Sequence, residues 1–578
     1  MNELEIEDWT TTKKKQIKSG NIFQVNTTNK TFKHHLSMRH RLLILLLALA
    51  TTTGCHFKNK QADLILHNAN IYTVDDAFST FEAMAIKDGK ILALGTEREI
   101  LNEYDAPQVI DCGKQFIYPG FIDGHCHFLG YGRTLQEVNL DSTQSFAEVI
   151  ERVVAFKPIN SRGWIIGRGW DQNDWADQSF PSRSILDSLY PSTPVALQRI
   201  DGHAMLVNAE AMRRAGIDAA TIVSGGDIDF IKGILIDNAM NLITDVLPKY
   251  SREDDIAALL AAQERCFAAG LTTVDEAGLM KSDVDLIKQL QAENKLKMRM
   301  YIMLADDSLN YAHYLKAGID TSDRLTVRAF KFYADGALGS RGACLLAPYD
   351  DVLPFSYGLM LHDAIHFRRK AYDLRQAGFQ MCTHAIGDSA NRVMLDIYGE
   401  VVGDSADHRW RIEHAQVVHQ NDMSKFAKYH VIPSVQPTHA TSDMPWAPQR
   451  LGRNRVMRAY TYRELKEQNG MVALGTDFPV EGISPIHTFY AAVLRKDLKG
   501  QPKEGFQQEN ALSREDALRG MTIWPAIANF EENKKGSIEV GKFADLVVLD
   551  QDLIKCNEAR LPQSKVAMTI VQGEVVFK

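Results

Sequence analysis

Cysteines, basic patches and long apolar runs are all scarce in this chain. Its 578 residues contain seven cysteines at scattered spacings without a CxxC pair, which speaks against a zinc ribbon and a disulfide-stapled fold. The formal net charge is -8, and no basic patch with interleaved aromatics occurs, so a nucleic-acid partner is not indicated. There is no internal repeat either. With 45% hydrophobic residues, this length predicts one large barrel-type domain with appendages.

The main apolar run near the N-terminus is too short to span a bilayer as a stable helix. It covers residues 42–50, follows the basic segment 38–41, and precedes Thr52, Thr53, Gly54 and Cys55. A basic segment followed by a short apolar run is typical of a signal peptide. Its end resembles the lipobox of bacterial lipoproteins, with Cys55 as the lipidated residue. Thr52 stands where Leu is usual, so an N-terminal anchor that is never cleaved is the alternative.

The segment 38–55 therefore predicts export to the bacterial cell envelope, with a lipid at Cys55 as the only attachment to a membrane. Which leaflet holds the lipid is left open. The polar residues 1–37 are interpreted as a mis-called extension ahead of a start at Met38, with Met1 as the alternative start.

Both ends of the remaining chain are rich in short strand-like runs. Asp88-Gly89, between two such runs, is a strong hairpin signal. We expect strands within residues 62–66, 71–74, 83–86, 91–94, 536–550, 566–571 and 574–576. Residues 62–115 and 526–578 should pair into one composite β-sandwich.

Between these ends, in residues 116–525, apolar strand-like runs alternate with helical stretches, the pattern of βα units around a parallel sheet. Eight parallel strands close a barrel. The eight expected strands are 121–127, 271–276, 298–304, 327–333, 379–384, 410–414, 431–436 and 472–477. The long segment at about 130–260, which contains Trp164, Trp170 and Trp175, is expected to be an inserted subdomain that covers the barrel mouth.

Five of the eight expected strands end in metal-binding types of side chain. In a barrel of this kind, the carboxyl ends of the strands form the active site. His125 and His127 stand two residues apart, so both imidazoles face one pocket. Each histidine alone is more often a satisfied core or rim residue, but the set is much more specific than any member. It consists of His125, His127, Lys331, His384, His414 and Asp477.

Lys331 needs a separate explanation, because a lysine in an apolar strand is costly unless it is paired or modified. Burial lowers its pKa, and a neutral amine can take up carbon dioxide to form a carbamate. That change converts a cation into an oxygen ligand able to bridge two metal ions. The alternative is a lysine whose ammonium group reaches the surface.

With this set of residues, the chain resembles the amidohydrolase superfamily, and within it the amidohydrolase-3 or YtcJ-like branch that includes N-substituted formamide deformylases. The segment GSIEVGKFADLVVLD at 536–550 also carries the resemblance, which extends from about residue 62 to 578. It implies a distorted (β/α)8 barrel with a divalent metal centre, commonly zinc, of one or two ions. By position, His125, His127 and Asp477 would hold the buried ion. His384 and His414 would hold the exposed ion, with carbamylated Lys331 between them.

The resemblance also implies a hydrolytic mechanism. Asp477 would take a proton from metal-activated water and return it to the leaving amine, while His414 or a second ion polarises the carbonyl. His203 is expected as a further catalytic donor over the mouth, with a structural role as the alternative. The three tryptophans either wall an apolar substrate pocket or pack the insert.

The leading function is hydrolysis of a non-peptide C–N bond in a small-molecule amide of N-formyl or N-acyl type. The same site would also suit an ester, a lactone or another carbonyl or phosphoryl centre. A surface-tethered binding protein without turnover is the alternative from another class, although none of the six expected ligands is missing. The oligomeric state is left open, with a homo-oligomer as one option.

Overall fold

The computed structural model describes residues 60–156, 163–172, 175–199, 204–223, 226–339, 341–403 and 407–578. The signal segment, Cys55 and His203 lie outside the described residues. None of the helices within these ranges combines the length and the apolar character that crossing a membrane requires.

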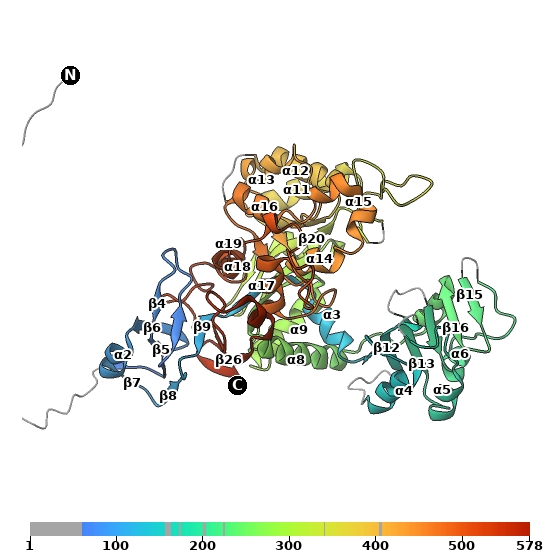
Figure 1. The fold of residues 1–578 in the computed structure, drawn as a ribbon, viewed down its shortest axis with the longest axis horizontal. Coiled ribbons are helices and arrows are strands. Elements are labelled where there is room, and N and C mark those ends of the chain that lie inside the picture. The colour runs from blue at the N-terminus through green and yellow to red at the C-terminus, as the bar shows by residue number, and fades with distance from the viewer. Residues whose placement is uncertain are drawn as a thin grey trace, which may run out of the picture. The chain divides into compact units, whose positions relative to one another are not determined.

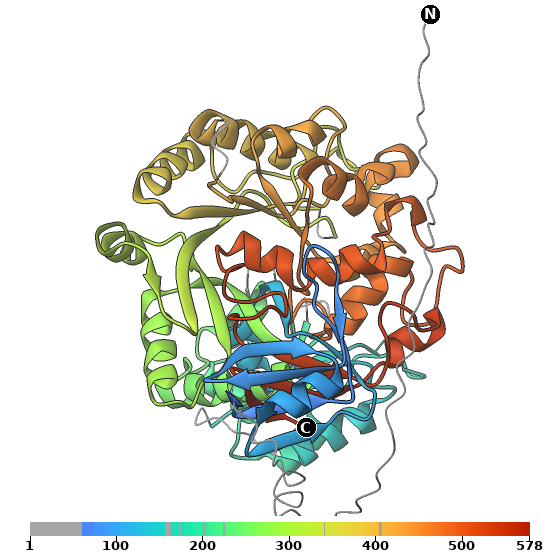
Figure 2. The same ribbon diagram turned by 90° about the vertical axis from the view of Figure 1, so that its left-hand side faces the viewer.

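Eight parallel strands follow one another in one sheet in the middle of the chain, part of which is visible in Figure 2. Their order is β10 (Phe121–Cys126), β17 (Leu271–Leu279), β18 (Arg299–Ala305), β20 (Leu325–Tyr333), β21 (Gln380–Ala385), β22 (Arg411–His414), β23 (Ile432–Val435) and β24 (Ala473–Leu474). A ninth, short strand, β19 (Asp320–Thr321), pairs antiparallel with the fourth of them. All eight expected strands are confirmed. The last strand is shorter than predicted, because the chain leaves the sheet at Gly475.

The first and last strands approach each other at their carboxyl ends. The Asp477 backbone N–H donates to the His125 carbonyl at 2.8 Å, and the His127 N–H donates to the Phe478 carbonyl at 2.8 Å. A Cβ on Gly475 would lie 2.5 Å from the His125 nitrogen, so only glycine fits this approach. The sheet is thus a distorted, nearly closed barrel, and its seam joins His125 and His127 to Asp477.

Helices lie between most of the barrel strands (Figure 1). In α11 (Ala364–Ala377), Phe367, Ala371 and Leu374 are buried at helical spacing, Asp363 caps the first turn, and Gly378 ends the helix in a left-handed conformation. The other principal helices are α3 (Phe128–Thr134), α8 (Arg252–Ala268), α9 (Lys281–Ala292), α10 (Ser308–Ala317), α12 (Asp388–Val402), α13 (Met423–Lys428), α14 (Pro437–Asp443), α15 (Ala447–Arg455), α16 (Tyr462–Asn469), α17 (Pro485–Leu494), α18 (Arg514–Gly520) and α19 (Ile523–Ala528).

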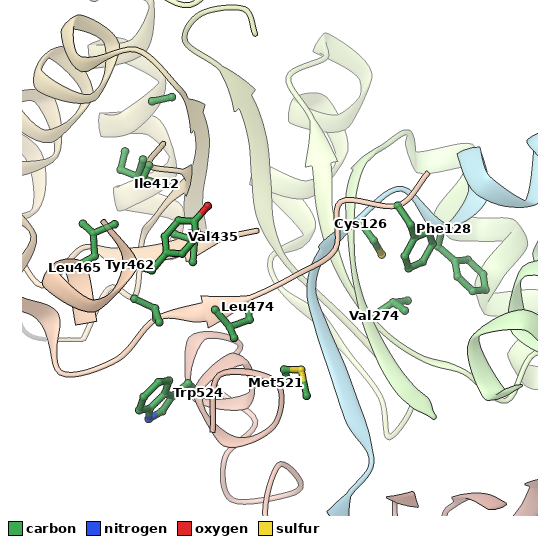
Figure 3. Packing of buried hydrophobic residues seen from close by; sticks show 14 of the residues in the cluster. Cys126, Phe128, Val274, Ile412, Val435, Tyr462, Leu465, Leu474, Met521 and Trp524 are labelled. Carbon is green, nitrogen blue, oxygen red and sulfur yellow. The ribbon is translucent and has the colours of Figure 1, made fainter. Parts of the chain in front are cut away.

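A large apolar core packs the barrel strands against these helices. Figure 3 shows part of it, including Cys126 at the end of β10, Phe128 at the start of α3, Val274 of β17 and Leu474 of β24. Cys126 is fully buried among these side chains, so it packs into this core from between the two histidines.

The two ends of the chain meet in a pair of sheets, as expected (Figure 2). β9 (Phe116–Pro119) pairs antiparallel with β25 (Leu546–Leu549) and parallel with β3 (Asn70–Tyr72), so this module extends past residue 115. A shared apolar cluster packs the two sheets together. The remaining strands are β2 (Leu64–His67), β4 (Thr80–Phe81), β5 (Ala83–Lys87), β6 (Lys90–Gly95), β8 (Gln108–Asp111), β26 (Val566–Val571) and β27 (Glu574–Phe577).

The insert forms a six-stranded sheet of its own with separate apolar clusters. Trp164, Trp170 and Trp175 are buried in these clusters, and the indole N–H of Trp170 donates to the Leu197 carbonyl at 2.7 Å. The tryptophans therefore pack the insert. This burial does not support the alternative, in which they wall a substrate pocket. A place over the barrel mouth stays a prediction. The strands, in sheet order, are β11 (Val138–Asn139), β12 (Ile165–Trp170), β13 (Val195–Arg199), β14 (Ala204–Val207), β16 (Ile234–Asp237) and β15 (Gly226–Asp229).

Candidate metal centre

Three of the six expected ligands meet at the barrel seam, and the side chain of a fourth reaches them from across the sheet. His125 Nε2 lies 3.7 Å and His127 Nε2 lies 3.4 Å from Asp477 Oδ1. Lys331 Nζ, on the fourth strand of the barrel, lies 2.8 Å from His125 Nε2. One ligand atom from each of His125, His127 and Asp477 lies within 4.8 Å of the others. These side chains are close enough to share one ion.

The remaining two expected ligands adjoin this group. The rings of His384 and His414 have centroids 4.5 Å apart, and the His414 ring lies 5.1 Å from that of His125. The fold therefore brings all six side chains into one cluster from strands far apart in the sequence. His203, the seventh expected site residue, lies outside the described part of the chain.

Hydrogen bonds on the far side of each ring orient His125 and His127. His125 Nδ1 lies 2.6 Å from Glu413 Oε2, and His127 Nδ1 lies 3.1 Å from the Ala277 carbonyl oxygen. A carboxylate and a carbonyl only accept, so both Nδ1 atoms carry the hydrogen and both Nε2 atoms present a lone pair. Such partners are typical of metal-binding histidines.

The carboxylate of Asp477 completes this arrangement. Its Oδ1 is buried and accepts no hydrogen bond, although it faces both Nε2 atoms. A buried acceptor without a donor is costly in free energy. Here the carboxylate oxygen also faces two imidazole lone pairs, so a cation between the three atoms would stabilise them. Two nitrogen donors and one carboxylate oxygen are a suitable partial ligand set for zinc.

Two of the expected ligands adopt a backbone conformation that is rare outside glycine. φ is +72° at His414 and +61° at Asp477. Residues are held in this region only where the surrounding structure imposes it, and such positions gather at functional sites.

Burial governs the ionisation of the lysine. It lowers the pKa of Lys331 below its ordinary value, against the opposing effect of the Glu413 and Asp477 carboxylates. Burial also acts on Glu413, but the nearby His125, Arg411 and Lys331 lower the pKa of Glu413 to about 2. Glu413 is therefore an anion that accepts the His125 hydrogen.

Three residues of the site were not identified from the sequence. Glu413 orients His125, and Gln436 Oε1 lies 2.7 Å from His414 Nδ1. His439, in α14, has its ring stacked 6.0 Å from that of His414, and its buried Nε2 lies 3.8 Å from Asp477 Oδ2. The only local signal for His439 is its place shortly after the end of the seventh barrel strand.

A buried ion pair joins strands of the same barrel close to the candidate metal centre. Arg411 Nη1 donates to Asp275 Oδ2 at 2.9 Å and to the Gly124 carbonyl at 3.2 Å, while Asn529 Nδ2 donates to Asp275 Oδ1 at 2.7 Å. Arg411 and Asp275 are fully buried. Since Gly124 precedes His125, this network fixes the strand that carries the two histidines.

Comparison with known proteins agrees with this architecture. Residues 108–577 match the amidohydrolase family. The chain is 28% identical over 529 residues to the putative amidohydrolase YtcJ of Bacillus subtilis (strain 168), covering 89% of this chain and 99% of that protein. It is 28% identical over 549 residues to the N-substituted formamide deformylase of Arthrobacter pascens, covering 89% and 98%.

A solved structure supports the same family assignment. An uncharacterized metal-dependent hydrolase from Pyrococcus horikoshii OT3 superimposes with a TM-score of 0.73 at 26% identity, covering 86% of this chain and 99% of that one. Because the family match spans well over half of the sequence, this chain belongs to the amidohydrolase family of metal-dependent hydrolases.

Proposed function

We propose that the protein hydrolyses the C–N bond of a small-molecule amide, of N-formyl or N-acyl type, at a metal centre built from His125, His127, Lys331, His384, His414 and Asp477. The observation that carries this proposal is the group of acceptors at the seam, where two oriented Nε2 atoms face the unpartnered Oδ1 of Asp477. The N-substituted formamide deformylase of Arthrobacter pascens supports the choice of bond.

A bound divalent ion, zinc by its donor set, would supply a Lewis acid that lowers the pKa of water and polarises the substrate carbonyl. Asp477 Oδ2 takes the proton of the attacking water as the oxygen joins the carbonyl carbon. The same carboxyl group then donates that proton to the amide nitrogen as the C–N bond breaks. The products are a carboxylic acid and an amine. His439 Nε2 lies beside this carboxylate, where a ring N–H can donate to the developing oxyanion. His414 directs its Nδ1 hydrogen to Gln436 Oε1, so its Nε2 presents a lone pair and suits a ligand role.

A panel of substrates tests which class of bond the protein hydrolyses. A soluble form beginning near Gln61 and loaded with zinc is expected to release amine from N-substituted formamides or N-acyl amines. Amine release is measured by derivatisation and mass spectrometry, with heat-treated protein as the control. Turnover of esters or lactones alone would favour the second hydrolytic function. Full zinc content without any turnover would favour the binding protein.

We further propose that Lys331 carries a carbamate. Its lowered pKa favours the neutral amine, whose nitrogen attacks carbon dioxide. An N–C bond forms and one proton leaves the nitrogen, so the cation becomes an anion with two oxygens. His125 Nε2, at 2.8 Å from Nζ, lies beside the group that this reaction modifies.

Bicarbonate is therefore expected to raise zinc uptake by the metal-free protein, because the carbamate adds oxygen ligands. Elemental analysis of the reloaded protein measures this uptake. In Lys331→Ala, bicarbonate should have no effect and the zinc content should fall. Lys288→Ala, at an exposed lysine, is the matched control. Equal uptake with and without bicarbonate in the wild type would contradict the carbamate.

The sequence of residues 38–55 supports a proposal on location. We propose that the protein is exported and held in the bacterial cell envelope by a lipid on Cys55.

A separate proposal concerns the reaction. We propose that His203 of the insert acts as a further hydrogen-bond donor at the barrel mouth.

A further inference from the structure

A second group of metal-binding side chains lies outside the candidate metal centre. His366 Nε2 lies 2.9 Å from Asp306 Oδ2. The rings of His362 and His366 are stacked, with centroids 4.3 Å apart and an interplanar angle of 20°. One ligand atom from each of Asp306, His362 and His366 lies within 4.8 Å of the others. We name these three residues the rim cluster.

The rim cluster joins two segments at the carboxyl-end side of the barrel. Asp306 directly follows β18, whose last residue, Ala305, is the register partner of Lys331. His362 and His366 flank the start of α11, which follows the long segment after β20. The Asp363 side chain accepts the His366 backbone N–H at 2.7 Å, so the first turn that carries His366 is fixed.

The carboxylate of Asp306 is also held in orientation. Tyr311 Oη donates to Oδ1 at 2.8 Å, and Lys370 Nζ lies 3.3 Å from the same oxygen. Burial would raise the pKa of Asp306, but its hydrogen bonds to Tyr311, His366 and Lys370 lower it below the ordinary value. The group is thus an anion whose Oδ2 faces His366. Partners that orient a ligating carboxylate in this way are common around metal ions.

The donor types select the class of ion. Two imidazoles and one carboxylate suit first-row transition metals such as zinc, whereas calcium and magnesium prefer oxygen ligands alone. We propose that Asp306, His362 and His366 bind one divalent transition-metal ion, which ties the start of α11 to the end of β18. On binding, the hydrogen between His366 Nε2 and Asp306 moves to Nδ1 of the same ring, so that Nε2 and the carboxylate each present a lone pair to the ion.

The neighbouring charges give this site a distinctive property. Lys370 Nζ lies against the Tyr311 ring, 3.4 Å from its centroid, and its positive charge opposes a cation on Asp306. Removing that charge should therefore tighten metal binding, whereas adventitious binding by surface histidines elsewhere would not respond. This inference does not depend on the reaction at the candidate metal centre.

The test is equilibrium dialysis of the full chain against micromolar zinc, followed by elemental analysis of zinc per chain. We expect the wild type to bind one zinc ion more than either His362→Gln or His366→Gln. Each substitution should weaken zinc binding at the rim cluster by about tenfold or more. Lys370→Gln should bind the same number of ions more tightly. His313→Gln, at an exposed histidine of the adjacent α10, is the matched control and should behave as the wild type.

Circular dichroism in the presence of a chelator checks that the variants are folded, and Asp306→Asn gives an independent third removal of a ligand. Equal zinc content in the wild type and all three ligand variants would overturn the proposal. So would equal loss in His313→Gln, because the ions would then be adventitious only. Repeating the comparison in a His125→Gln background, which weakens the candidate metal centre, separates the two sites, because the decrease at the rim cluster should be the same there.

Discussion

Replacing Asp477 by asparagine should lower kcat on the amide substrate by about 10²–10⁴-fold, the range for loss of a positioned general acid or base. The carboxamide keeps the size of the carboxylate but cannot take the proton of the attacking water. Asparagine also tolerates a positive φ, so the backbone at +61° should not change. Initial rates at saturating amide measure the effect, together with zinc per chain.

Asp88→Asn is the matched control for this variant. Asp88 also has a positive φ, +50°, and lies exposed in a hairpin of the β-sandwich. Its substitution should leave the rate and the zinc content unchanged. If Asp477→Asn kept full zinc content and a kcat near that of the wild type, the role of Asp477 in proton transfer would be wrong, and His439 would be the next residue to test.

Asp275→Ala should be among the most destabilising single substitutions in the barrel. It would leave the fully buried Arg411 guanidinium without its carboxylate, and breaking a buried pair in this way costs about 3–5 kcal/mol. Because Arg411 also donates to the Gly124 carbonyl, the strand that carries His125 should shift and zinc affinity should fall. Urea unfolding followed by tryptophan fluorescence measures the first effect.

The control is a pair of the same charge type at the surface. Asp320 Oδ2 lies 2.6 Å from Lys288 Nζ, where the lysine is exposed and the aspartate is partly exposed. Asp320→Ala should cost no more than about 1 kcal/mol, as is usual for exposed pairs. A similar small cost for Asp275→Ala would show that water or a rearranged Asn529 replaces the missing carboxylate.

The barrel strands were predictable because their signal is local. Runs such as Val327 to Tyr333 are mainly apolar, as expected for strands buried on both faces, and each contains or ends near a polar side chain. The same reasoning placed His125, His127, Lys331, His384, His414 and Asp477 at one edge of the sheet, since parallel strands align their carboxyl ends. The short β24 was overestimated because the Gly475 approach to His125 depends on the first strand.

The remaining features of the site depend on contacts between distant parts of the chain. Glu413 and His125 are 288 residues apart, and nothing in either local sequence indicates that one orients the other. The same holds for Arg411 with Asp275, for His439 beside Asp477, and for the burial of the insert tryptophans.

The sequence by itself predicted the barrel strands and the side chains at their ends, because periodicity and spacing are properties of neighbouring residues. The family followed from the resemblance that those residues carry. Only the tertiary structure decided which ring nitrogens face Asp477, which carboxylate stays unpartnered, and that Asp306 meets His366. Those outcomes are set by packing and burial, which act between residues that the chain brings together only when it folds.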